Sequence, residues 1–94
     1  MPTVVYGDFT WDDVKALENA RKHGVTFEEA ATIFDDPRAI DAPDKLVSGR
    51  LVLIGRSSRV RILFVVHAQI EESGVRIISA RKASPSQRRL YEEG

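Results

Sequence analysis

The chain has 94 residues, of which 43% are hydrophobic and 30% are charged, as is typical of a small globular domain rather than a disordered tail. We expect one domain over residues 1–94, with a core too small to enclose a dinucleotide cofactor. The absence of cysteine excludes disulfides, thiolate metal sites and thiol nucleophiles, and no apolar run approaches the roughly 20 residues that span a bilayer. These features predict a cytoplasmic protein with no cofactor and no membrane contact.

The charges are distributed unevenly, although the formal net charge is zero. Residues 1–47 contain five Lys or Arg against ten Asp or Glu, whereas residues 48–94 contain nine against four. The basic half could present an anion-binding face to a nucleic acid, or the two halves could simply neutralise each other. The charge pattern leaves both interpretations open.

A first helix is predicted to begin after Thr10 as its N-cap and to end at Gly24. Between them, Val14 and Leu17 recur at helical spacing. Trp11, at the start of this amphipathic helix, is expected to anchor the core rather than to stack on a nucleic-acid base.

A second helix is predicted from Thr26 and Glu29, which form a T-x-x-E capping box, and it is expected to end before Pro37. Only two residues separate the helices, so we expect a helical pair rather than one long rod. Residues 38–49 contain few apolar side chains and are expected to form a loop or an edge strand.

Three segments rich in Val, Ile, Leu and Phe are predicted strands: Arg50–Arg56, Val60–Ala68 and Val75–Arg81. Their short separators favour an antiparallel meander, whose edge a short strand at Val4–Tyr6 could join. The run Ser84-Pro85-Ser86-Gln87 predicts a capped helix through Tyr91. The expected fold class is α+β, with two N-terminal helices, an antiparallel sheet of three to four strands and a short C-terminal helix.

The alternation of side chains along the middle strand separates two faces. One face holds only apolar residues and is predicted to be the core side, namely Val60, Ile62, Phe64, Val66 and Ala68. The other face has polar groups at its ends and is expected to be partly open as a groove, namely Arg61, Leu63, Val65 and His67. In the next strand, the alternation places Arg76 and Arg81 on opposite faces and leaves the core side ambiguous.

The two histidines are the candidates for proton transfer, because the pKa of an imidazole lies near neutral pH. His67 ends an apolar strand, and the alternative is a structural histidine that bonds a backbone carbonyl. His23 follows Lys22 in the last turn of the first helix, where cations also complement the helix dipole. The run of basic residues that ends at His23 favours a corner that contacts anions.

Basic residues surround the start of the last helix. Arg81 and Lys82 precede the Ser84 cap, and Arg88 and Arg89 occupy the first turns beyond it. Free backbone N–H groups at a helix start, with flanking guanidinium groups, would form a phosphate site, although charged residues are common around surface helices.

Motifs for phosphate loops, dinucleotide sites, serine hydrolases and zinc proteases are absent. Two histidines 44 positions apart do not form a metal-ligand cluster. The sequence therefore permits an acid–base mechanism without a metal ion.

Several motifs, in one order, resemble the BrnT family of toxins and cover nearly the whole chain from Phe9. They are Phe9-Thr10-Trp11-Asp12, Asn19, Arg21 to Val25, Phe27-Glu28-Glu29-Ala30, Phe34-Asp35-Asp36-Pro37, Gly55-x-Ser57, the strand ending in His67, Arg76 to Arg81, and Arg88-Arg89 with Tyr91. Each motif is weak alone, but their ordered combination is specific. The chain departs from the family pattern in residues 41–49, a shorter loop than expected, and at Gly49, where an acid commonly precedes the arginine of the next strand.

The resemblance implies a bacterial type II toxin with a RelE-like fold, a small ribonuclease that arrests growth by cutting RNA. It also implies a partner, a BrnA-like antitoxin that holds the toxin inactive. That antitoxin carries a ribbon-helix-helix DNA-binding dimer, through which the complex would be a hetero-oligomer similar to others that repress their own operon.

RNA supplies its own nucleophile, the 2′-hydroxyl, so the protein needs a base, cations for the phosphate and an acid for the leaving 5′ oxygen. We assign proton transfer to His67 or His23, the scissile phosphate to Arg76 and Arg81, and phosphate binding or transition-state charge to Lys22. Further RNA contacts are expected from Arg61, Lys82, Arg88 and Arg89.

Two other functions stay open on the sequence alone. The basic face could belong to a non-catalytic module that binds nucleic acid or protein, or the chain could be an inactive toxin kept as an antitoxin partner. A catalytic His67 would lose cleavage but keep RNA affinity on replacement by Ala, which separates an enzyme from a binding module.

Overall fold

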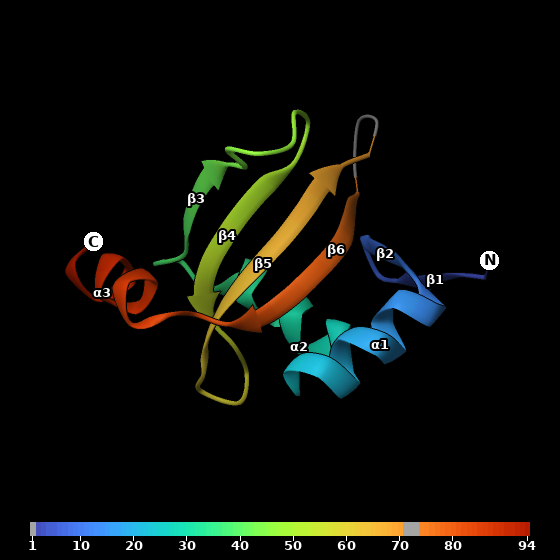
Figure 1. Ribbon diagram of the computed structural model, residues 1–94, viewed down its shortest axis with the longest axis horizontal. Coiled ribbons are helices and arrows are strands. Elements are labelled where there is room, and N and C mark those ends of the chain that lie inside the picture. The colour runs from blue at the N-terminus through green and yellow to red at the C-terminus, as the bar shows by residue number, and fades with distance from the viewer. Residues whose placement is uncertain (1, 71–73) are drawn as a thin grey trace.

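The computed structural model describes residues 2–70 and 74–94 and has the expected α+β fold class (Figure 1). Its elements are, in chain order, β1 (Thr3–Tyr6), β2 (Phe9–Asp12), α1 (Asp13–His23), α2 (Phe27–Thr32), the 3-10 helix η1 (Ile33–Asp35), β3 (Ile40–Pro43), β4 (Leu51–Arg56), β5 (Ile62–Gln69), β6 (Val75–Lys82) and α3 (Pro85–Glu93). No helix in the described part of the chain is long and apolar enough to cross a membrane.

The strands form one mixed sheet in the order β1-β2-β6-β5-β4-β3. Every neighbouring pair is antiparallel except β2 and β6, which run parallel. The prediction of a purely antiparallel sheet of three to four strands is therefore wrong in strand number and in this one direction. Part of the loop between β5 and β6, residues 71–73, lies outside the described residues. The sequence analysis did not predict β2. This strand has only four residues and leads directly into α1, so its apolar positions also fit the helical pattern of α1.

α1 begins later than predicted. Thr10 lies in β2, and the N-cap is Asp12, whose carboxylate accepts hydrogen bonds from the N–H groups of Val14 and Lys15 at 2.9 and 3.2 Å. The predicted end is confirmed, since Gly24 stops the helix in the left-handed region with φ 69°.

α1 is held against the edge of β6 by a polar side chain. The buried amide of Asn19 donates hydrogen bonds to the carbonyl oxygens of Ala80 and Val25, at 2.8 and 3.0 Å, and accepts one from the Ala80 N–H at 3.1 Å. β2 pairs with only the first two residues of β6. Farther along β6, the Asn19 side chain therefore provides the hydrogen bonds that a neighbouring strand would otherwise provide. Val14 and Leu17 are exposed, so their helical spacing does not mark a core face.

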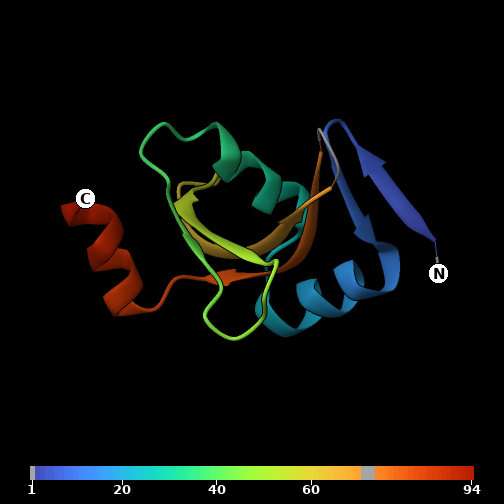
Figure 2. The ribbon, with the colours of Figure 1, turned by 90° about the horizontal axis from the view of Figure 1, so that it is seen from above.

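The hydrophobic core lies between one face of the sheet and the α2–η1 segment, which Figure 2 shows on one side of the curved sheet. Trp11 is 2% exposed, which confirms it as a core anchor. The core comprises Trp11, Val25, Phe27, Ala30, Ala31, Ile33, Leu53, Leu63, Val65, Ile77 and Ala80. The other sheet face, turned toward the viewer in Figure 1, is covered by no helix in the described residues; we call it the open face.

The expected core side of β5 is wrong. Leu63 and Val65 are fully buried against the helices, and His67 is 6% exposed on the same side. Phe64 and Val66, predicted to be core, are half-buried on the open face. β5 is apolar on both faces, so alternation could separate the faces but not tell which one the helices cover.

A bulge in β6 changes which arginines share a face. Val66 of β5 pairs with Ser79, but the next residue, His67, pairs with Ile77, so one residue of β6 is extra. Phe64 opposes Arg81 and Ala68 opposes Arg76, which places both arginines on the open face. The alternation had put them on opposite faces, because a period of two cannot reveal an inserted residue.

The capped start of α3 is confirmed. Ser84 Oγ accepts from the Gln87 N–H, and the Gln87 side chain accepts from the Ser84 N–H. Tyr91 docks the helix by donating a 2.6 Å hydrogen bond to Asp36, which follows η1. Burial alone would raise the pKa of Asp36, but the hydrogen bonds from Tyr91 and from two backbone N–H groups outweigh it and lower that pKa.

Candidate nucleic-acid interface

A groove lined with cationic side chains follows the junction of α1 and β6; we call it the α1 groove. It consists of two cavities of about 130 and 370 Å³ that share Lys15, Arg50 and Ile78. The residues that line it are Asp12, Lys15, Glu18, Asn19, Lys22, His23, Arg50, Arg76, Ile77, Ile78 and Ser79. The α1 groove therefore borders the open face along one edge of the sheet.

Positive charge dominates the α1 groove. Four Lys or Arg side chains line it, together with His23, against the two carboxylates of Asp12 and Glu18. The Asp12 carboxylate already accepts the N–H groups that begin α1. Both ion pairs recorded among residues 2–70 and 74–94 involve Glu29, outside this groove, so the cations of the α1 groove are available to a bound anion.

The α1 groove contains three of the residues predicted for chemistry, in separate cavities: Arg76 lines the cavity at the start of α1, and Lys22 and His23 line the cavity at its end. It also contains Lys15 and Arg50, which the sequence analysis did not single out. The sequence did contain a signal that Lys15 belongs with Lys22: the two are seven residues apart and so share a helix face. Arg50 had only the general signal of the basic half, since the register of β4 beside β5 is what brings it near β6.

Gly49, the residue before Arg50, has φ 85°, in the left-handed region that favours glycine. A glutamate or aspartate at this position would be strained. The shorter loop of this chain thus has a turn where the family pattern commonly has an acid, and the turn delivers Arg50 into the α1 groove.

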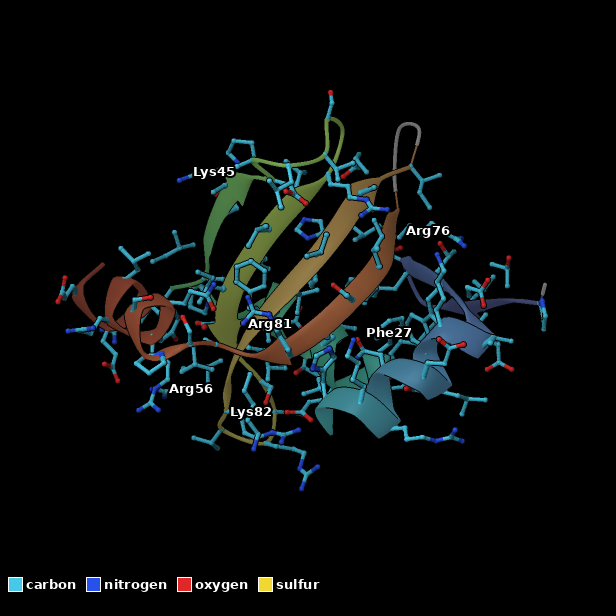
Figure 3. All side chains as sticks on the ribbon, in the orientation of Figure 1. Phe27, Lys45, Arg56, Arg76, Arg81 and Lys82 are labelled. Atoms are coloured by element: carbon cyan, nitrogen blue, oxygen red, sulfur yellow. The ribbon has the colours of Figure 1, made fainter. Side chains whose placement is uncertain are left out.

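Arg81 lies on the open face, nearer to α3 than Arg76 is (Figure 3). Its guanidinium carbon stacks 4.3 Å from the centre of the Phe64 ring, and its Nη1 donates to Gln87 Oε1 at 3.2 Å. Arg81 is therefore held in one orientation by β5 below it and by α3 beside it. Arg81 lies five positions after Arg76, about 15 Å along the strand, so the two suit different phosphates of one RNA strand better than a single phosphate.

His67 is not brought to these arginines. It faces the core, where its ring packs edge-on against Phe34 at 4.9 Å and its Nδ1 lies 3.4 Å from the Val65 carbonyl oxygen. Burial lowers the pKa of His67 below its usual 6.5. This placement favours the structural alternative for His67 and leaves His23 as the histidine of the groove.

Arg61, expected to contact RNA, is engaged inside the protein. Its guanidinium forms a two-pronged ion pair with Glu29, whose side chain is only 4% exposed, and it also donates to the Gly24 carbonyl. Ser57 Oγ donates to the same carboxylate at 2.7 Å. Burial would raise the pKa of Glu29, but the hydrogen bonds from Arg61 and Ser57 outweigh it and lower that pKa. The capping box is thus only half formed, since the Glu29 side chain turns to Arg61 instead of to the start of α2.

A second cationic pocket, the α3 pocket, has a volume of about 460 Å³ and lies between α3 and the ends of β4 and β6. Two residues expected to bind RNA, Lys82 and Arg88, meet there with Arg56 and the engaged Arg61. The full lining is Arg56, Val60, Arg61, Ile62, Lys82, Ala83, Arg88, Tyr91 and Glu92. Arg89 is exposed on α3 and does not line this pocket.

At the start of α3, part of the backbone of the predicted phosphate site is engaged by the helix itself. Pro85 has no N–H, the Gln87 N–H donates to Ser84 Oγ, and the Arg88 N–H donates to the Ser84 carbonyl. The N–H groups of Gln87 and Arg88 are thus already engaged within the helix start.

Among residues 2–70 and 74–94, no three His, Cys, Asp or Glu side chains are grouped so that they could hold a metal ion.

The chain is similar to known toxins over most of its length. The family described as the ribonuclease toxin BrnT of type II toxin-antitoxin systems matches residues 11–87. A crystal structure of the ribonuclease toxin BrnT from Brucella abortus is 29% identical, with a TM-score of 0.65, over 79% of this chain and 92% of that one. No curated protein matches the sequence. The matched range includes every residue of the α1 groove.

Proposed function

Because this chain belongs to the BrnT family, the ribonuclease toxins of type II toxin-antitoxin systems, we propose that it cuts RNA in the α1 groove, without a metal ion and with the RNA 2′-hydroxyl as nucleophile. The observation that carries the proposal is the continuous lining of cations along the α1 groove: Arg76 lies in one cavity, Lys22 and His23 lie in the other, and Lys15 and Arg50 line both. A groove of this kind offers both a proton-transfer group and cations for a phosphate.

In this mechanism, the 2′ oxygen attacks the adjacent phosphorus while the His23 imidazole takes the hydroxyl proton. The bond between phosphorus and the 5′ oxygen then breaks, and the imidazolium returns the proton to that oxygen. The products are a 2′,3′-cyclic phosphate and a 5′-hydroxyl. The protons balance with one histidine, because the proton that it accepts from the 2′-hydroxyl is the proton that the 5′ oxygen takes up.

The cations act on the charge of the pentacoordinate phosphate. Arg50 lines both cavities of the groove, Arg76 lines one and Lys22 lines the other. A phosphate bound where the two cavities meet would thus have cations from the sheet and from α1 on its two sides. Arg81, fixed on Phe64, is placed to bind another phosphate farther along the RNA. We assign no catalytic role to His67, since its ring lies in the core.

The proposal is tested by cleavage of a labelled RNA oligonucleotide by the purified chain in excess EDTA. We expect cleavage to 2′,3′-cyclic phosphate ends, and a loss of at least about 100-fold in kcat for Arg76→Ala and for His23→Ala. The matched control is Arg38→Ala, an exposed arginine outside both cationic pockets, which should cleave at the wild-type rate. Activity that EDTA removes and a divalent metal restores would overturn the metal-free mechanism.

The same assay separates the two other functions. An RNA that binds without being cut would make the chain a non-catalytic binding module. Failure to bind or cut any RNA would make it an inactive toxin.

Membership of a type II family implies an antitoxin partner. We propose a ribbon-helix-helix antitoxin that neutralises the toxin by covering the α1 groove and the open face. The apolar floor available to it is Phe64 and Val66 rather than Leu63 and Val65, which are buried on the other side of the sheet.

A further inference from the structure

We propose that the α3 pocket is a second phosphate-binding site, which holds the backbone of the substrate RNA at a distance from the bond that is cut. The inference rests on the proposed ribonuclease function, because it describes how that substrate is held.

The charge of the α3 pocket comes from three separate elements. Arg56 ends β4, Lys82 ends β6, and Arg88 lies in the first turns of α3, so their side chains approach one volume from different directions. The Arg61 charge is neutralised by Glu29, and one carboxylate, that of Glu92, also lines the pocket. The pocket therefore keeps an excess of positive charge, which suits a phosphate with several oxygens.

The pocket is larger than a phosphate alone requires. Its volume is about 460 Å³, and its wall includes the apolar side chain of Ile62 and the ring of Tyr91. The hydroxyl of Tyr91 is already bonded to Asp36, which fixes the ring in place. A nucleotide could thus place its phosphate on the cations and its sugar or base against these side chains.

Val60, at the mouth of the pocket, is a strained residue. It has φ 61°, which a β-branched side chain rarely adopts, and it is 73% exposed. The turn is maintained by Ser57, whose carbonyl accepts from the Val60 N–H at 2.9 Å and whose hydroxyl donates to the buried Glu29. Strain of this kind persists only where surrounding contacts enforce it, and it presents an apolar group beside the cations.

The α3 pocket lies beyond the α1 groove along β6. The cavity that holds His23 reaches Ser79, three residues or about 10 Å before Lys82, and Arg76 lies six residues or about 20 Å before it. Arg81 lies between them on the open face, as Figure 3 shows. An RNA strand must therefore carry at least two phosphates to occupy both sites, whereas a dinucleotide, with its single phosphate, can occupy only one.

The test compares a dinucleotide with a ten-residue RNA as substrates of the full chain. The variant is the double substitution Lys82→Gln and Arg88→Gln. The control double, Arg38→Gln and Lys45→Gln, removes the same charge outside both sites; Figure 3 shows Lys45 far from Lys82 and Arg56. We expect the pocket variant to raise KM for the ten-residue RNA at least tenfold with kcat within twofold, and to leave kcat/KM for the dinucleotide unchanged.

Salt provides a second readout. For each phosphate that the variant no longer neutralises, the slope of log KM against log salt should fall by about 0.7 for the long substrate. An unchanged KM for the long RNA, or an equal loss on the dinucleotide, would overturn the inference while leaving the ribonuclease function intact. If the wild type cuts neither RNA, the proposed function fails, and binding of a ten-residue 2′-O-methyl RNA by anisotropy then decides the pocket: at least tenfold weaker binding by the variant supports it, and unchanged binding rejects it.

Discussion

The Glu29–Arg61 ion pair ties α2 to the turn between β4 and β5. The Glu29 side chain is 4% exposed and that of Arg61 23%, so removal of the arginine leaves a buried carboxylate without its charge partner. We predict that Arg61→Ala lowers the free energy of unfolding by about 3 kcal/mol. The control is Arg59→Ala, whose side chain is 70% exposed and lies 4.0 Å from the same carboxylate; it should change stability by less than about 0.5 kcal/mol. Urea denaturation measures both, and equal effects would mean that Arg61 is not a structural residue.

His67 makes stability depend on pH. Because burial lowers the pKa of His67 below 6.5 in the folded state, the unfolded chain takes up this proton first as the pH falls. Stability should therefore decrease below about pH 6.5 and continue to decrease until the lowered pKa is reached. Glu29 and Asp36 have pKa values lowered from 4.5 and 3.8, so their contributions are lost only in more acidic solution.

We predict that His67→Leu removes this dependence between about pH 7.5 and pH 5.5 and leaves RNA cleavage within about threefold of wild type. Urea denaturation at the two pH values tests the first part, and the oligonucleotide assay tests the second. A variant that folds but does not cleave RNA would mean that His67 is a catalytic residue.

At the scale of elements, the sequence predicted those whose signal is local. The capping box at Ser84 and the glycine at position 24 set the limits of helices, and three apolar runs located β4, β5 and β6. What depends on distant partners could not be predicted, namely the short β2, the face of β5 that the helices cover and the bulge in β6. The candidate site follows the same rule: Lys22 and His23 were predicted from their own helix end and line the α1 groove, whereas Arg50 reaches the groove only through sheet register.

The attachment of α1 illustrates a contact that no pattern signals. Asn19 satisfies both backbone groups of Ala80, which are otherwise unpaired at the edge of β6. We predict that Asn19→Ala destabilises the fold by about 3 kcal/mol, because it leaves two buried polar groups without partners. Glu18→Ala, an exposed change one residue earlier, is the control and should have little effect. Urea denaturation measures the stabilities, and hydrogen exchange at Ala80 should quicken only in the Asn19 variant.

At the scale of the whole molecule, the cations are concentrated along the open face and at both of its ends. Lys15, Lys22, Arg50 and Arg76 line the α1 groove, and Arg56, Lys82 and Arg88 line the α3 pocket. Arg81, between them, stacks on an apolar floor that no helix of the described residues covers. A surface with this charge and this apolar centre suits an extended polyanion, and it equally suits an acidic, amphipathic segment of a protein that imitates one.

Two surfaces compete as the place where the antitoxin binds, and they predict opposite results. If it covers the open face, the double change of Arg76 and Arg81 to Ala should weaken binding at least about 30-fold, because the antitoxin's charged groups lose their counterparts. The same complex should then fail to bind a 2′-O-methyl RNA.

The rival surface is the outer side of α1, where Val14 and Leu17 are exposed by 38% and 62%. Leu17→Ser should leave the affinity unchanged if the open face is the docking surface. Calorimetric titration with the cognate antitoxin decides between them: loss of affinity in Leu17→Ser alone would place the antitoxin on α1, away from the cations, and inhibition would then have to act by changing the position of α1 against β6.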